Sequence, residues 1–456
     1  MRSLVAARLA VCLAVTLAGS PGAAFAQAAP GLFTLDAEPN PRLALAFPGK
    51  DPAYYPRIAE MGIGVVRIGV GWKWLEPEPG QYRWKSLDAQ IAALDAAGLV
   101  PLITLEADAP WAVEHGDQVK NGTPRDMATW GALVGRVVER YDMDGQGDGP
   151  SLSRPMRYYQ VANEPLSDSN RSGGWAGSDG SLVDFVNTAH DAAKAADPEA
   201  VFILGGFASM NLDAFLVTEF GADMPVQQVW QNGTKTVLDT GDAGMMASLA
   251  AAYGRMQRLL AEARYDYADV HLYGPEDRDD ARFDMIAGMA HAPVLSTECG
   301  GPSLDYGGTY TGQDHYRAVL WRNLNVLAEG APFCAWFGLG EGLGSTYGNS
   351  RVQLLDGQGN DKPGVHAYRL LARLVDENAT VLRLAPALFE VQTQQGPVRI
   401  ALTMDGITAL GQMGPILQPA VCIRDAETRE TDMIVSVAPC DGYSILIAGP
   451  GLAGLL

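Results

Sequence analysis

The chain has 456 residues, and its 33 basic against 53 acidic residues give a formal net charge of −20 at pH 7. This excess of negative charge opposes binding to nucleic acid and to anionic lipid surfaces, which are themselves negative. The length exceeds what one hydrophobic core usually supports, so we expect a large domain with a smaller one attached.

The first 26 residues predict a secretory signal peptide. Arg2 and Arg8 supply the positive start, Leu9–Leu17 the apolar run, and Ala24–Ala26 a cleavage site of the small-x-small type. The apolar run is too short for a membrane-spanning helix, and no other stretch is long and apolar enough to be one. We therefore expect cleavage near Ala26 and a secreted or periplasmic protein.

Four cysteines follow this segment. Cys422 and Cys440 lie in the strand-rich C-terminal region, where an oxidising compartment would allow them to pair. Cys299 directly follows Glu298 and Cys334 lies in an apolar strand, and we expect both to be buried thiols. No cysteine spacing resembles that of a zinc site.

Residues 27–41 form an N-terminal segment, and from residue 42 to 375 short apolar runs alternate with amphipathic helical stretches. The eight candidate strands are Leu43–Phe47, Gly64–Val70, Val100–Leu105, Arg157–Asn163, Val201–Gly205, Ala268–Leu272, Pro293–Thr297 and Pro332–Phe337. The helical stretches between them include Leu87–Ala97, Met127–Tyr141, Ser181–Ala196, Met245–Arg264 and His315–Ala328. Such alternation predicts parallel strands with helices outside, closing as a (β/α)₈ TIM barrel. An open doubly wound sheet is the alternative, which the lack of a glycine fingerprint after the first strand disfavours.

Residues 376–456 have a different pattern, with short alternating runs separated by turn signals such as Asp405-Gly406 and Asp441-Gly442. The candidate strands are Val381–Leu384, Leu388–Gln392, Val398–Met404, Ala420–Ile423, Met433–Val437 and Tyr443–Ile447. They predict a small antiparallel β-sandwich packed on the barrel. Leu32–Asp36 is a candidate additional strand of this domain.

Polar residues within the barrel strands mark the mouth of the barrel, because parallel strands are otherwise apolar on both faces. The residues that break the apolar runs are Arg67, Gln160, Asp269, His271, Ser296 and Thr297. Period-two alternation places Asp269, His271 and Tyr273 on one side of their strand. We expect these side chains at the carboxyl ends of the strands, where barrel enzymes hold their active sites.

Two glutamates end candidate strands four and seven. Glu164 lies in Asn163-Glu164-Pro165, and Glu298 follows Val294–Thr297. Together with the loop Trp72–Trp84 after the second strand, these motifs resemble the clan A glycoside hydrolases, in particular family 39-like and family 5-like enzymes. The resemblance covers about residues 40 to 375 and implies that Glu164 is the acid/base and Glu298 the nucleophile.

The chemistry of these residues agrees with that resemblance. A retaining β-glycosidase needs two carboxyl groups ~5 to 5.5 Å apart, and an inverting one ~6.5 to 9.5 Å. We expect Glu298 to be ionised and Glu164 to be protonated. Arg67 is predicted to hold the charge of Glu298, Tyr273 to donate a hydrogen bond to it, and Asn163 to bind the sugar 2-hydroxyl.

Other candidates surround this pair. His271 is a candidate site residue, with a satisfied core histidine as the alternative. Trp336 is a candidate platform for a sugar ring, and Trp72, Trp74, Trp111 and Tyr310 are candidates for flanking subsites, with ordinary packing as the alternative. Glu106, Asp108 and Glu341 are candidates to bind sugar hydroxyls, whereas Glu76 is expected to have a structural part.

The predicted function is therefore double-displacement hydrolysis of an extracytoplasmic poly- or oligosaccharide. A carbohydrate-binding barrel without activity and a transglycosylase are the alternatives. No redox cofactor or catalytic metal is implied, and the oligomeric state is not predicted. Asp142, Asp144 and Asp148 alternate as in a calcium loop but lack the glutamate at position twelve, so a solvated turn is the alternative.

Overall fold

The computed structural model describes residues 30–33, 37–229, 235–301, 311–340, 352–415, 418–434, 445–450 and 452. The predicted signal peptide, Tyr310, Glu341 and Cys440 lie outside these residues. Among the described helices, none combines the length and the apolar character that crossing a membrane requires.

Eight parallel strands form the barrel. They are β1 (Asn40–Ala46), β2 (Ile63–Gly71), β3 (Val100–Glu106), β6 (Tyr158–Val161), β7 (Val201–Leu204), β10 (Ala268–Leu272), β11 (Val294–Cys299) and β12 (Cys334–Phe337). Their order in the sheet is β10-β11-β12-β1-β2-β3-β6-β7. Parallel bridges Ile203–Tyr267 and Phe207–Val270 join β7 to β10 at the remaining gap. The eight predicted strands and the (β/α)₈ barrel are confirmed.

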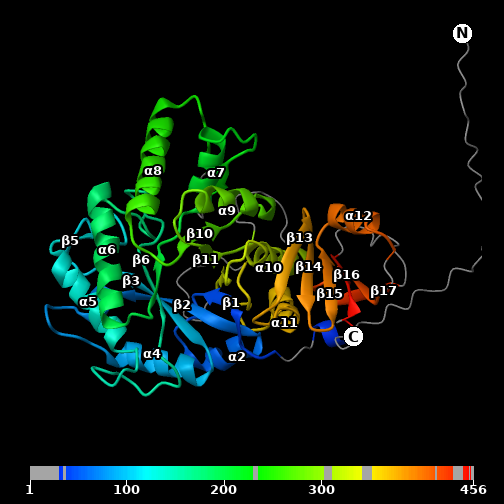
Figure 1. Ribbon diagram of the computed structural model, residues 1–456, viewed down its shortest axis with the longest axis horizontal. Coiled ribbons are helices and arrows are strands. Elements are labelled where there is room, and N and C mark those ends of the chain that lie inside the picture. Colours follow the sequence, from blue (N-terminus) through cyan, green and yellow to red (C-terminus); the bar gives the residue numbers. More distant parts are fainter. Residues whose placement is uncertain are drawn as a thin grey trace, which may run out of the picture.

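Helices surround the strands (Figure 1). They are α2 (Tyr55–Glu60), α4 (Lys85–Ala96), α5 (Met127–Glu139), α6 (Asp179–Ala196), α7 (Ser209–Thr218), α8 (Ala243–Glu262), α9 (Asp279–Ala287), α10 (Gly312–Ala328) and α11 (Pro363–Leu374). Each of α5, α6, α8 and α10 begins with a side-chain cap, supplied by Asp126, Ser178, Asp242 and Thr311 in turn. In α5 the buried residues recur at positions 130, 133, 134, 137 and 138, the spacing that turns one apolar face toward the barrel.

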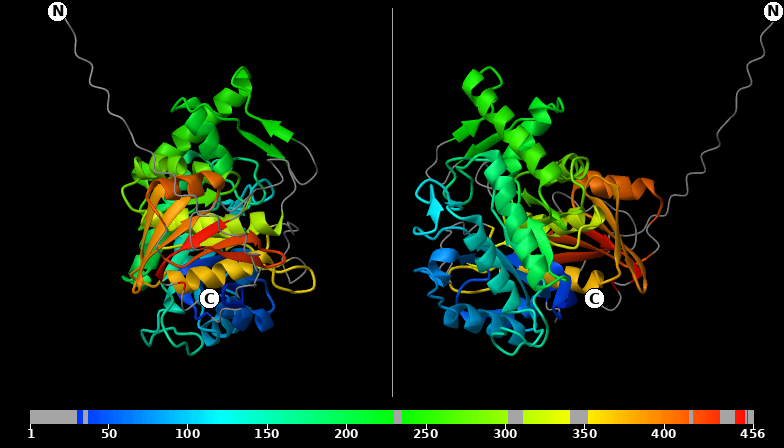
Figure 2. Two further views of the ribbon diagram at one scale, coloured as in Figure 1. Left: turned by 90° about the vertical axis from the view of Figure 1, so that its right-hand side faces the viewer. Right: turned by 60° about the vertical axis from the view of Figure 1, so that its left-hand side comes forward.

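Short elements occupy the connections between strands and helices. They are the helices α3 (Trp72–Leu75), η1 (Pro52–Tyr54) and η2 (Glu276–Arg278) and the small hairpins β4 (Val113–Glu114) with β5 (Thr123–Pro124) and β8 (Gln227–Val229) with β9 (Lys235–Val237). The connection from β7 to β10, which contains α7, β8, β9 and α8, projects from the barrel in both figures (Figures 1 and 2).

The C-terminal part is antiparallel, as predicted. One six-stranded sheet has the order β13-β14-β15-β18-β16-β17. Its strands are β13 (Thr380–Ala385), β14 (Leu388–Thr393), β15 (Gly396–Ala401), β16 (Ala420–Asp425), β17 (Glu430–Ile434) and β18 (Ile445–Ala448). Phe389, Ile400 and Ile447 face the barrel core, whereas Leu388 and Leu446 pack with α12 (Met404–Gln412) on the other face. In the described residues, this sheet therefore packs against the barrel on one face and against α12 on the other, and no second sheet completes a sandwich.

Two local predictions are wrong. The segment expected to be a strand at Leu32–Asp36 contains a helix, α1 (Pro30–Phe33), up to the last residue described there. The turn expected at Asp405-Gly406 is the first turn of α12, because the side chain of Thr403 accepts a hydrogen bond from the Gly406 amide and caps the helix.

The expectation of free thiols at Cys299 and Cys334 is also wrong. Their sulfur atoms form a disulfide, with 6.2 Å between the Cα atoms and a sequence separation of 35. Both residues end up close together because β11 and β12 are neighbours in the barrel sheet. Cys422 is disulfide-bonded as well, while Cys440 lies outside the described residues.

Candidate active site

The carboxylate of Glu298, on β11, is held from two sides. Arg67 on β2 donates from Nη1 to Oε2 at 2.8 Å, and the hydroxyl of Tyr273 donates to Oε1 at 2.8 Å. The exposed fraction of the side chain is 13% for Glu298 and 5% for Arg67. The Glu298 carboxylate thus bonds to a buried guanidinium and still reaches solvent.

Arg67 also aligns the neighbouring residues. Its Nη2 donates to Asn163 Oδ1 at 2.8 Å, and its Nε lies 3.0 Å from Thr104 Oγ1 and 2.9 Å from Gln160 Oε1. Since Nη1 is bound to Glu298, one planar guanidinium connects strands β2, β3, β6 and β11. The predicted contact of Arg67 with Glu298 is present in the structure.

Glu164 follows β6 in an unusual backbone conformation. Its φ is +46°, in the left-handed region, and Ala162 two residues earlier has φ +67°. The Glu164 amide donates to the carbonyl of Gly206 at 3.0 Å. Asn170 Nδ2 donates to Oε2 at 3.0 Å, and Nδ1 of His271 lies 3.0 Å from Oε1. The backbone turn therefore directs the carboxyl group back toward the barrel axis.

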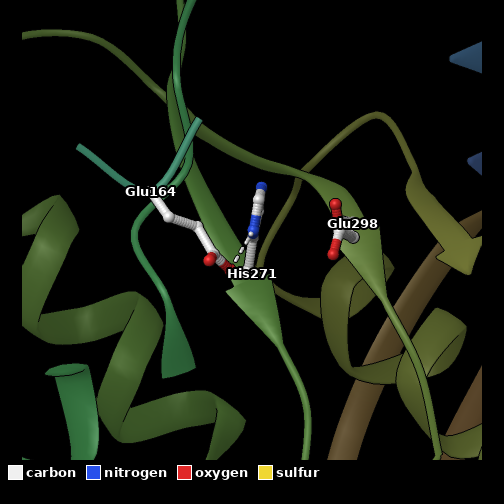
Figure 3. A group of neighbouring side chains, drawn as sticks. All are labelled: Glu164, His271 and Glu298. Atoms are coloured by element: carbon white, nitrogen blue, oxygen red, sulfur yellow. Dashed lines mark hydrogen bonds and ion pairs between the residues drawn. The ribbon is translucent and has the colours of Figure 1, made fainter. Parts of the chain in front are cut away.

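The two glutamates meet at the mouth of the barrel. Figure 3 shows Glu164, His271 and Glu298 converging from three segments of the chain. One carboxylate oxygen of Glu164, one of Glu298 and one ring nitrogen of His271 all lie within 4.8 Å of one another. In register, His271 on β10 pairs with Glu298 on β11. Carboxyl groups with one oxygen of each this close together favour the spacing of a retaining pair, ~5 to 5.5 Å, over that of an inverting pair, ~6.5 to 9.5 Å.

His271 carries the proton of this cluster. Burial opposes its charge, but Glu298, Asp269 and Glu164 outweigh that effect and raise the pKa of His271 to about 10. Burial alone would raise the pKa of Glu164, yet the hydrogen bond and charge of His271, with Asn170 and Arg67, lower it. Without substrate, His271 and Glu164 thus share one proton, which lies on the imidazole of His271. The sequence analysis expected this proton on Glu164.

A buried polar layer supports His271 from below. Asp269, which is 0% exposed, accepts from the Thr297 amide at 2.8 Å, the Thr297 hydroxyl at 2.6 Å and Gln160 Nε2 at 2.7 Å. Its Oδ2 lies 3.7 Å from His271 Nε2, too far for a direct hydrogen bond, so the two interact as charges. Burial would raise the pKa of Asp269, but His271, Thr297 and Arg67 lower it, and it stays ionised.

Two glycines next to this layer, Gly206 and Gly300, have no room for a side chain. A Cβ atom on Gly206 would lie 2.2 Å from Cδ2 of His271 and 2.7 Å from Oδ2 of Asp269. A side chain at that position would displace both groups. Gly300 has the same relation to Tyr273, whose ring would lie 2.5 Å from an added Cβ. Glycine at these two positions keeps the imidazole and the phenol in place.

The predicted aromatic residues lie at different depths. Trp72 is 1% exposed and donates to Glu76, and Trp336 is 0% exposed and donates to the carbonyl of Val352. Trp111 is half-buried, packs edge-on against Trp72 and donates to the Glu76 carbonyl at 2.9 Å. The rings of Trp72 and Trp336 are covered in this structure, and the contact of all three rings with a sugar stays a prediction.

Among the residues that the structure describes, two groups of side chains have ligand atoms close enough together for a metal ion. Glu164, His271 and Glu298 form one group, but a protonated imidazole offers no lone pair, so this arrangement suits proton transfer better. Asp142, Asp144 and Asp148 form the other, in the loop between α5 and β6, at the end of the barrel opposite the active site. Backbone amides of that loop already bind Asp142, Asp144 and Asp148, and calcium there stays a prediction.

Sequence reasoning expected Gln160, Asp269 and Thr297 at the barrel mouth without giving them a specific part, and it did not name Thr104 or Asn170. Their polarity inside apolar strands was the available signal for all except Asn170. Asn170 reaches Glu164 only because the loop after β6 folds back, where an added Cβ on Gly173 would lie 2.3 Å from the Asn163 carbonyl oxygen. That contact depends on loop geometry.

Comparison with known proteins gives a partial family match and a clear fold match. A glycoside hydrolase family 42 model, described as beta-galactosidase, matches residues 53–132. No curated protein matches the chain. The solved structures that resemble it include a family 39 glycoside hydrolase from Bacteroides cellulosilyticus WH2, with 14% identity, 90% of this chain and 81% of that chain covered, and a TM-score of 0.54.

Two further solved structures have the same fold. A family 39 beta-xylosidase from Caulobacter crescentus is 15% identical, with 91% of this chain and 98% of that chain covered and a TM-score of 0.53. A family 30 subfamily 8 xylanase from Clostridium acetobutylicum is 9% identical, with 91% and 97% covered and a TM-score of 0.53. At such identities the likeness establishes the fold.

The barrel, the family match over residues 53–132 and the paired glutamates agree with the resemblance of the sequence motifs to clan A glycoside hydrolases. Within this class, the solved neighbours named above belong to families 39 and 30.

Proposed function

We propose that the protein is a retaining β-glycosidase that hydrolyses an extracytoplasmic poly- or oligosaccharide by double displacement. One observation carries the proposal: carboxylate oxygens of Glu164 and Glu298 lie within 4.8 Å of each other, with different partners. Glu298 is bound by Arg67 and Tyr273, which suits an ionised nucleophile. Glu164 is bound by His271, which suits a group that exchanges a proton.

In the first step, a carboxylate oxygen of Glu298 attacks the anomeric carbon, and the bond from that carbon to the leaving oxygen breaks. Glu164 gives a proton to the leaving oxygen. Because the proton rests on Nδ1 of His271 in the free site, it first passes to Oε1 of Glu164 across their hydrogen bond, in which the two heavy atoms lie 3.0 Å apart. His271 and Glu164 therefore act together as the general acid.

In the second step, the Glu164 carboxylate takes a proton from water, whose oxygen attacks the anomeric carbon and releases Glu298. Among the charges that raise the pKa of His271, Glu298 makes the largest contribution. While Glu298 is esterified that charge is absent, which lowers the pKa of His271. Since the proton has left with the leaving group, the Glu164 carboxylate is available as a base.

The identity of the cleaved sugar is tested with a small set of substrates. The names of the solved neighbours and of the family model make aryl β-xylosides and β-galactosides the first substrates to test. A 2-fluoro glycoside of the cleaved sugar, followed by peptide mapping, should label Glu298 in the wild type. Proton NMR of the first product should show a retained β configuration.

Variants separate the two roles. Glu298→Gln should abolish turnover, and Glu164→Ala should reduce kcat/KM by about 10²- to 10⁴-fold, with partial rescue by azide. Glu114→Gln, an exposed glutamate paired with Arg125, is the control and should behave as the wild type. Wild-type rates in either site variant, or label on another carboxylate, would refute the mechanism. Product analysis with added acceptor sugars would reveal a transglycosylase.

A further inference from the structure

One wall of the barrel mouth extends outward from the paired glutamates along β2. On β2, Gly69 and Gly71 follow Arg67 at intervals of two, so all three residues face the barrel interior. Gly69 is exposed, although the strand residues on either side of it are buried. A glycine in a strand interior often marks a place where a ligand approaches the backbone. Bare backbone thus faces solvent one step beyond the Arg67 that binds Glu298.

Two paired charges border this open backbone. In register, Gly69 lies beside Thr104 and Gly71 beside Glu106 of β3. Glu106 forms an ion pair with Lys120 at 2.7 Å, and its Oε1 would lie 2.7 Å from a Cβ on Gly69. Further out, Asp108 forms an ion pair with Lys73 at 3.0 Å. Each carboxylate is neutralised by a lysine, so this wall offers donors and acceptors without net charge.

An aromatic ring ends the wall. Trp74 is 72% exposed, and its Cδ1 would lie 3.1 Å from a Cβ on Gly71. Lys73 Nζ lies 5.6 Å from the centre of the same ring. The five strand residues from Arg67 to Gly71 are separated by four steps and span about 13 Å, more than one pyranose ring covers. A side chain this large and this exposed, continuous with the site, provides a stacking surface for the apolar face of a sugar.

We propose that Gly69, Glu106, Asp108, Lys73, Lys120 and Trp74 form a second sugar-binding subsite, which holds a neutral pyranose unit of the same glycan chain beyond the unit that is cleaved. The inference rests on the proposed function and names its substrate class as a neutral oligosaccharide of at least three units. The paired charges bind hydroxyl groups, and Trp74 stacks on the ring. An acidic sugar would instead compete with Glu106 and Asp108 for their lysines.

The test compares substrates of different length in Trp74→Ala. The probes are a p-nitrophenyl β-glycoside and the matching tetrasaccharide, xylotetraose or a β-galactotetraose. The loss of kcat/KM on the tetrasaccharide should exceed the loss on the aryl glycoside by about 3- to 10-fold, as expected for one stacking contact. Phe220→Ala is the control, because Phe220 is 55% exposed on the projecting part after α7. It should leave both substrates at wild-type rates.

Binding in the Glu298→Gln background gives an independent readout. Calorimetry should show weaker binding of the tetrasaccharide when Trp74→Ala is added, and no such change when Phe220→Ala is added. Equal losses on both substrates, or unchanged tetrasaccharide binding, would overturn the subsite. Absence of turnover on every glycoside, with binding that still depends on Trp74, would overturn the proposed hydrolysis and leave the subsite standing.

Discussion

Replacing Asp269 by asparagine tests the assignment of the acid as a unit of two residues. Asp269 is fully buried, and its carboxylate lies 3.7 Å from Nε2 of His271. Two unit charges about 4 Å apart interact by about 4 kcal/mol at an effective dielectric constant of about 20. Since one pKa unit corresponds to about 1.4 kcal/mol, the loss of this charge can lower the pKa of His271 by up to about three units.

The assay is the pH dependence of kcat/KM, which reports ionisations of the free enzyme. In the wild type, the alkaline limb should follow loss of the proton from the pair of His271 and Glu164, whose imidazole has a pKa of about 10. In Asp269→Asn the limb should move to lower pH, because the imidazole then releases its proton more easily. Gln160, Thr297 and the introduced amide group retain hydrogen-bonding capacity, so the circular dichroism spectrum should be preserved.

Two results would refute this reasoning. An alkaline limb at the wild-type position in a folded Asp269→Asn protein would mean that Asp269 does not hold the proton on His271. A uniform fall in kcat/KM at every pH would point to a structural role alone. Glu390→Gln, in the C-terminal sheet, is the matched control for removal of a buried carboxylate and should leave the pH profile unchanged.

Four further outcomes follow. Tyr273→Phe removes one hydrogen bond to Glu298, which should cost about 1.5 to 3 kcal/mol in kcat/KM; a change within twofold would exclude that contact from catalysis. Cys299→Ser should lower the free energy of unfolding by about 3 to 4 kcal/mol, the value for a closed loop of about this length, and urea denaturation that matches the wild type would contradict it. Because the pKa of His271 is raised from 6.5 to about 10, its stabilisation is complete below pH 6.5 and is lost as pH rises toward about 10. Glu164, with a lowered pKa, stabilises above its ordinary value of 4.5 and loses this as pH falls, so urea midpoints that are flat in both windows would oppose the charge network. If Asp144 binds calcium, EGTA should lower the melting temperature of the wild type and not that of Asp144→Ala.

The barrel was predictable because its strands are apolar on both faces and recur between amphipathic helices. The same contrast marked Arg67, His271 and Glu298, since a polar residue in such a strand is conspicuous. The proton position was not predictable, because it depends on distances among Asp269, His271 and Glu164 that no sequence pattern contains.

Other misses have similar causes. Cys299 and Cys334 were expected to be separate thiols, since nothing in a linear pattern states that strands seven and eight bring them to a Cα distance of 6.2 Å. At Asp405-Gly406 a turn signal and a helix start use the same residue types, and only the cap from Thr403 decides between them.

The left-handed backbone at Glu164 has a consequence for how the chain can change. A glutamate at φ +46° is held where glycine would fit without steric cost. Glu164→Gly should therefore yield a protein harder to denature than Glu164→Ala, although neither can transfer the proton. Substitutions that stabilise the fold at this position therefore remove activity. In a related protein that no longer has to hydrolyse glycosides, we expect this glutamate to be among the first residues replaced.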